Sequence, residues 1–128
     1  MTEAEERWHA FAKSGDPSLL ADLIDADAVF ESPVVHTPQR GRAVVCAYLS
    51  AAVKLLNGDT FRYLDAWRNE RGLVLEFETE IDGVRINGVD IITFSEDGHR
   101  ITHFKVMVRP LKAINLLHRL MGEALAKA

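Results

Sequence analysis

Apolar residues recur at helical spacing in three stretches of the first half of the chain. Trp8 and Phe11 belong to the apolar stripe of a helix within the first 14 residues. A capping aspartate followed by proline predicts a second short helix over residues 16–24. A broader apolar face predicts a third and longer helix over residues 42–56.

The spacing of apolar residues then changes from helical to alternating, which is typical of strands with one buried face. Four strands follow in a meander, and Asp82-Gly83 predicts a tight hairpin between the middle two. Another short strand precedes Pro33, and Pro110 opens a final amphipathic helix. The five predicted strands span residues 28–32, 60–68, 72–81, 84–95 and 100–109.

Helices that precede an antiparallel meander indicate an α+β fold, in which the helices cover one face of the sheet. A length of 128 residues fits a single domain over residues 1–128. Where the sheet curves strongly, the two layers meet at one end and separate at the other. We therefore expect a cone-shaped fold with an internal cavity and an extra C-terminal helix.

Composition excludes several classes of protein. With 15 basic and 19 acidic residues the net charge is −4, which argues against nucleic acid as a partner. No stretch reaches the roughly 18 apolar residues of a membrane span, and the acidic start does not resemble a signal peptide. The single cysteine, Cys46, suits a reducing compartment, so we expect a cytoplasmic protein.

Segments in both halves of the chain are similar to one known superfamily. The run from Asn87 to Gly98, followed by residues 101–109, resembles the last two strands of the nuclear-transport-factor-2-like superfamily, in its SnoaL-like and ketosteroid-isomerase-like branches. Gly15-Asp16, residues 27–33 and Gly41-Arg42 occur in that superfamily's order. The resemblance implies the cone-shaped fold but leaves function open, because this superfamily includes isomerases, cyclases, hydrolases, dehydratases and binding proteins.

Asp90 is the leading candidate for chemistry. It interrupts the apolar run Val89-Asp90-Ile91-Ile92, where a carboxylate costs several kcal/mol unless it is neutral or paired. The resemblance places Asp90 where ketosteroid isomerases hold a protonated aspartate in their oxyanion hole. The alternative is an aspartate that only fixes the fold through hydrogen bonds.

Two other positions depart from the isomerase pattern that the resemblance implies. Ser32 stands where those enzymes have the proton-shuttling aspartate, and Trp8 stands where they have a tyrosine. Steroid isomerisation by that mechanism is therefore not expected. His36, in the loop after Ser32, is the candidate replacement base, with a solvent-exposed loop histidine as the alternative.

The sequence predicts neither a metal nor a cofactor. His99 and His103 have helical spacing but fall on a turn and a strand, where four residues span about 13 Å. No dinucleotide or phosphate-binding motif is present.

Aromatic and aliphatic residues predicted to face inward would line the cavity and accept a hydrophobic small molecule. The predicted ligand-binding residues are Trp8, Phe11, Phe30, Tyr48, Leu75, Phe77, Phe104, Val106 and Val108. Alternatively, these side chains simply fill a closed core.

Met107 and Arg109 fall on the outer face of the sheet, and members of the superfamily commonly dimerise through that face, so we expect a homodimer. Three functions compete. The first is a cofactor-independent isomerase, cyclase or lyase that uses Asp90 on a hydrophobic carbonyl compound. The second is a non-catalytic binding protein for such a ligand. The third is a dimerising association module whose pocket is vestigial.

Overall fold

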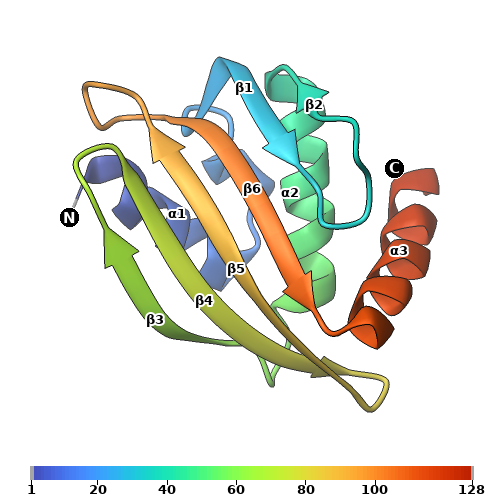
Figure 1. Cartoon of the computed structure of the whole chain (residues 1–128). Coiled ribbons are helices and arrows are strands. Elements are labelled where there is room, and N and C mark those ends of the chain that lie inside the picture. Colours follow the sequence, from blue (N-terminus) through green and yellow to red (C-terminus); the bar gives the residue numbers. More distant parts are fainter. Residues whose placement is uncertain (1, 128) are drawn as a thin grey trace.

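The computed structural model describes residues 2–127 as a curved six-stranded sheet with helices on one face. Figure 1 shows α1 and α2 behind the sheet and α3 to the right of α2, after the end of β6. The helices are α1 (Glu3–Ser14), the 3₁₀ turn η1 (Pro17–Leu19), α2 (Arg42–Leu56) and α3 (Leu111–Ala126). The strands are β1 (Ile24–Glu31), β2 (Gln39–Arg40), β3 (Arg62–Arg68), β4 (Gly72–Ile81), β5 (Val84–Phe94) and β6 (Ile101–Arg109).

The sheet has the strand order β2-β1-β6-β5-β4-β3. The predicted meander is present, with strand bounds within two residues of those expected. The four strands of the meander pair antiparallel as predicted, whereas β1, for which no pairing is predicted, lies parallel to β6. The first strand reaches β6 across the molecule, and periodicity within a strand carries no information on such long-range pairing.

The predicted helix over residues 16–24 is wrong. Asp16 does cap a helical segment, since its side chain accepts a hydrogen bond from the Ser18 amide at 3.0 Å. That segment is only the three-residue turn η1, and β1 already begins at Ile24. Leu20, Leu23 and Ile24 are fully buried as expected, so burial of these residues outweighs the local preference for helix.

Asp82 and Gly83 both adopt positive φ, 51° and 77°, and form the tight turn predicted between β4 and β5.

A second glycine, Gly88, is required for a close approach inside the sheet. A Cβ on Gly88 would lie 2.6 Å from the ring of Phe77 and 2.6 Å from the carbonyl oxygen of Met107. The Phe77 ring therefore lies across β5 at Gly88, two residues before Asp90.

An ion pair between the buried Glu5 and the half-exposed Arg68 fixes α1 on the edge strand β3. The Glu5 side chain is almost fully buried, and Arg68 Nε donates to its two carboxyl oxygens at 3.0 and 3.1 Å. This hydrogen bond lowers the pKa of Glu5, so the carboxyl stays ionised and paired. Trp8 lies three residues further along the same helix face, so the pair also sets the position of its indole.

Candidate functional site

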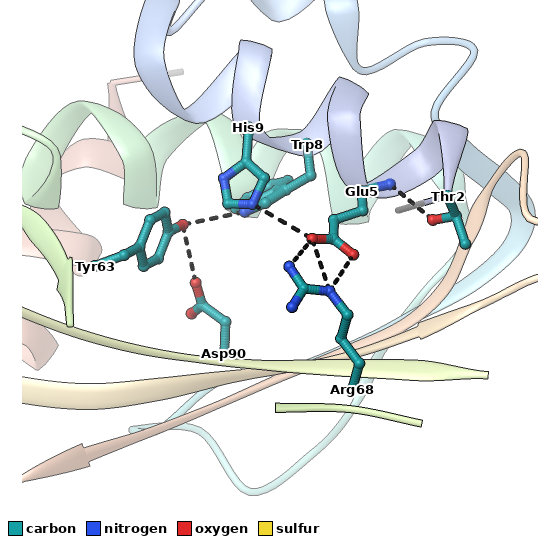
Figure 2. A network of polar contacts seen from close by, with 7 residues as sticks. All are labelled: Thr2, Glu5, Trp8, His9, Tyr63, Arg68 and Asp90. Atoms are coloured by element: carbon teal, nitrogen blue, oxygen red, sulfur yellow. Dashed lines mark hydrogen bonds and ion pairs between the residues drawn. The ribbon is translucent and has the colours of Figure 1, made fainter. Parts of the chain in front are cut away.

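The polar centre of the interior is a short chain of hydrogen bonds between three elements. Figure 2 shows the Tyr63 hydroxyl from β3 between the Trp8 indole of α1 and the Asp90 carboxyl of β5. Trp8 Nε1 donates to Tyr63 Oη at 3.1 Å. Tyr63 Oη lies 3.4 Å from Asp90 Oδ2, which is long for a hydrogen bond between oxygens.

The direction of these bonds follows from the chemistry of the side chains. An indole N–H can only donate, so Tyr63 must accept from Trp8 and keeps one O–H to give. That hydrogen points to Asp90 or to a ligand oxygen placed beside it. Because the contact with Asp90 is long, the hydroxyl can turn to such a ligand at little cost.

Burial controls the protonation of both groups. Asp90 is 7% exposed, and loss of hydration raises its pKa to about 7, against a smaller opposing effect of the hydrogen bond from Tyr63. The pKa of Tyr63 is raised well above 10, mainly by burial and then by the charge of Asp90. Near neutral pH, Tyr63 is thus a donor, and Asp90 exists in both its acid and its carboxylate form.

The second carboxyl oxygen of Asp90 is open to the interior space. Oδ1 has no hydrogen-bond partner within residues 2–127. Every fully buried polar side-chain atom in that part of the chain has a partner, so Oδ1 is not among the fully buried atoms. It therefore faces space that a ligand atom can reach.

An apolar cavity surrounds this centre. It measures about 50 Å³ as the space open to the centres of water molecules, which is room for only a few waters. Its walls come from the inner face of the sheet, from α2, from α3 and from the loop after β1. They are formed by Trp8, Phe30, Ser32, Pro33, Val34, Leu49, Ala52, Val53, Leu56, Asn57, Phe61, Tyr63, Phe77, Asp90, Phe104, Val106, Val108, Leu117 and Met121.

The structure brings most of the predicted lining residues to this cavity. Asp90 lines it, together with six of the nine predicted ligand-binding residues: Trp8, Phe30, Phe77, Phe104, Val106 and Val108. Phe11, Tyr48 and Leu75, which the sequence also predicts to line it, do not. Phe11 packs against Trp8, Tyr48 packs against Phe30, and Leu75 is buried in the core. Periodicity in a strand or helix predicts which face of the element a side chain lies on. It does not predict whether that side chain borders open space or packs directly against the opposite layer.

The prediction that His36 supplies a base to the Asp90 cavity is not supported. His36 is exposed and lines an open hollow on the outside, beside Glu31 and Lys105. This hollow shares residues 32–34, Val106 and Val108 with the cavity, but Asp90 does not line it. Ser32 does line the cavity, where its hydroxyl accepts a hydrogen bond from the Val34 amide at 3.1 Å. The tight turn from Ser32 to Val34 directs the next residues outward and takes His36 away from Asp90.

Tyr63 is the functional side chain that the sequence prediction missed. It pairs with Phe77 across the two strands, so it points into the same space as the predicted lining residues. Counting back along β3 from the turn before Gly72 places Leu64, and not Tyr63, opposite Phe77. A β-bulge at Leu64 shifts this register by one residue, and the alternation pattern does not show such a shift.

No group of three or more His, Cys, Asp or Glu side chains in residues 2–127 is placed to hold a metal ion. The two histidines with helical spacing are separated, since His99 pairs with Glu3 and His103 with Glu31. Within the same residues, no helix is long and apolar enough to cross a membrane.

Solved structures with the same fold include close relatives. A steroid Δ-isomerase from Pseudomonas aeruginosa is 36% identical, with a TM-score of 0.90 over 97% of this chain and 90% of that chain. An uncharacterised protein with a cystatin-like fold from Silicibacter pomeroyi is 29% identical, with a TM-score of 0.87 over 96% of this chain and 85% of that chain. An NTF-2-like protein of unknown function from Burkholderia xenovorans is 17% identical, with a TM-score of 0.66 over 91% of each chain, and shows the fold alone.

No curated protein matches the chain. The family model of the SnoaL-like domain does match, over residues 6–104. That segment contains most of α1, the Asp90 strand and most of the cavity wall, and it covers more than half of the sequence. The protein therefore belongs to the SnoaL-like family.

Proposed function

We propose that the protein binds a hydrophobic carbonyl compound in the Asp90 cavity and moves a proton beside the carbonyl group. It would act as an isomerase or lyase that needs no cofactor. The observation that carries this proposal is a buried carboxyl group, with a pKa of about 7, beside an obligate hydroxyl donor in an apolar cavity. Such a pair offers both a proton acceptor and a site for a developing negative charge.

Tyr63 would hold the carbonyl oxygen of the ligand. Its O–H is its one hydrogen to give, because Trp8 occupies its acceptor side. A donor fixed in this direction stabilises an oxygen that gains negative charge, and the apolar surroundings strengthen the interaction.

Asp90 would act as the general base. Its carboxylate takes a proton from the carbon next to the carbonyl group, and the electrons of that C–H bond move through the carbonyl to the oxygen held by Tyr63. The enolate collapses when the protonated carboxyl returns the proton to a different carbon, which shifts a double bond. If the enolate instead expels a leaving group, the reaction is an elimination. A base with a pKa near 7 is well matched to this task at neutral pH.

The 36% identity to a steroid Δ-isomerase supports the isomerase class. Two substitutions separate this chain from the ketosteroid-isomerase pattern, Ser32 for the shuttling aspartate and Trp8 for the tyrosine on the first helix. Among the residues that line the cavity, Asp90 is the one carboxylic acid and no histidine is present. In our proposal one residue, Asp90, therefore carries both proton steps.

The same observation favours a second candidate function. A cavity with a single titratable acid and no separate proton shuttle also suits a binding protein that holds a carbonyl compound without converting it. In that case Tyr63 and a neutral Asp90 would both donate to the ligand oxygen. Turnover distinguishes the two functions, whereas affinity does not.

We also propose that the protein is a homodimer formed through the outer face of the sheet. Trp67 and Met107 are 52% and 51% exposed on that face. Trp67 lies beside Val74 and Ile91 on neighbouring strands, and Met107 lies beside Val89, so the two exposed side chains extend an apolar surface. The association module considered from the sequence would use this face and leave the cavity unused.

The carbonyl site predicts distinct effects for two conservative substitutions. Tyr63→Phe should weaken binding of the two-ring ketone 1-tetralone about fivefold to tenfold, the equivalent of one hydrogen bond, as measured by calorimetry. Binding of tetralin, the hydrocarbon without the oxygen, should not change. Equal weakening for both ligands would show that Tyr63 only shapes the cavity.

Asp90→Asn should keep affinity for 1-tetralone within a few-fold and should reduce isomerisation of a β,γ-unsaturated cyclic ketone at least about 100-fold. The reaction is followed by the absorbance of the conjugated product. In the wild type the rate should rise between pH 6 and pH 8 as Asp90 ionises. Binding without turnover in the wild type would establish the binding protein instead.

Asp90 should also make stability depend on pH. Folding raises its pKa from 3.8 to about 7, so the folded protein keeps a proton that the unfolded chain releases. The free energy of unfolding therefore falls as pH rises through this range, by about 4 kcal/mol in total from this group. In urea denaturation, the stability of Asp90→Asn relative to the wild type should be greatest at pH 8 and should fall by more than half at pH 5. The exposed Asp59→Asn serves as the control, and an Asp90→Asn difference that is equal at both pH values would contradict the burial of the charge.

Light scattering after gel filtration should give twice the mass of one chain for the wild type. The double variant Trp67→Glu/Met107→Glu should run as a folded monomer, because two charges on the apolar surface oppose association. A monomeric wild type at tens of micromolar would exclude this dimer.

A further inference from the structure

One wall of the cavity comes from outside the segment that the family model matches. The match ends at residue 104, whereas α3 spans Leu111–Ala126 and contributes Leu117 and Met121 to the lining. The family segment thus supplies the polar centre, and the C-terminal helix supplies an apolar wall.

This wall lies away from the polar centre. Trp8 and Tyr63 come from α1 and β3, on one side of α2, and α3 lies on the other side of α2 (Figure 1). A ligand whose oxygen lies between Tyr63 and Asp90 would therefore extend its apolar body toward α3. The size of the apolar body that can bind depends on the space between α3 and the rest of the cavity wall.

Little space is free when the cavity is empty. About 50 Å³ holds a few waters, whereas sites for drug-sized ligands measure roughly 300–1,000 Å³. Most of the wall is made of aromatic and branched side chains, about half of which are buried. Met121 is only partly buried, and it differs because its unbranched side chain can fold into several shapes.

The second half of the helix is held less firmly than the first, since Leu120 packs against the core but is only partly buried. The buried residues of α3, Ala113, Leu116 and Leu117, lie in the first two turns. Beyond them, Arg119 forms an ion pair with Asp82 at 4.0 Å, and both of these side chains are largely exposed. Gly122, directly after Met121, has the low helix propensity of glycine. This half of α3 can therefore adjust to a ligand more easily than the sheet can.

We propose that Met121, supported by Leu117, determines the size of the hydrophobic body that the site accepts. Met121 acts as an adjustable end wall that faces the apolar part of the ligand while Tyr63 and Asp90 hold its oxygen. This inference rests on the proposed function and adds a specificity residue to it. Small cyclic ketones fit with Met121 in place, and larger fused-ring ketones bind only after its side chain moves.

Three ketones of increasing size test this role by calorimetry: cyclohexenone, 1-tetralone and a four-ring steroid enone. Met121→Ala should strengthen binding of the four-ring ketone at least about tenfold and weaken cyclohexenone several-fold, because the small ligand then leaves space unfilled. Met121→Phe should do the reverse and reduce binding of the four-ring ketone. Because the smaller and the larger side chain should change the affinities in opposite directions, a general loss of folding cannot produce both results.

Leu111→Ala is the matched control, since Leu111 is on the same helix but is 70% exposed and does not line the cavity. It should leave all three affinities unchanged. If 1-tetralone binds but neither Met121 variant changes the order of the three ketones, the size role is wrong and the carbonyl site stands. If no ketone binds the wild type or Met121→Ala, the proposed function is wrong and the size role is lost with it.

Discussion

The burial of one carboxyl group is the constraint on which this structure depends. Asp90 points from β5 into an apolar cavity where its charged form loses most of its hydration, and its pKa rises to about 7. A charge in this place would be costly without a donor, and Tyr63 is that donor. Tyr63 is in turn directed by Trp8, whose helix is held to β3 by the ion pair of the buried Glu5 with Arg68. Four side chains from α1 and β3 thus fix one proton-binding group on β5.

Much of the candidate site could be predicted from the sequence, because a carboxylate in an apolar strand is conspicuous. Parity along β4 and β6 placed Phe77, Phe104, Val106 and Val108 correctly. Tyr63 was missed since its strand contains a bulge, and its role depends on a hydrogen bond from a helix 55 residues earlier in the chain. His36 was misplaced because a loop has no periodicity that could indicate its direction. Site residues within one strand can be predicted from the sequence pattern. Contacts between side chains of different elements can be known only from how those elements pack.

The fold shows the same division between local and long-range information. The helix over residues 42–56 and the hairpin at Asp82-Gly83 follow from local patterns, and both were predicted with the observed bounds. The parallel pairing of β1 with β6 and the early start of β1 depend on contacts between the two ends of the domain. The role of α3 as a cavity wall also appears only in three dimensions, although its amphipathic pattern was clear. These long-range contacts bring the sheet and the helices together around the cavity.

The ionisation of Asp90 is the most direct test of this account. Carbon-13 NMR of the side-chain carboxyl, with Asp90→Asn used to assign the signal, measures its pKa in the folded protein. A midpoint near 7 is the result that a buried carboxyl beside Tyr63 requires. A midpoint near the ordinary value of about 3.9 would mean that water reaches the group freely and would remove the basis for proton transfer in this cavity.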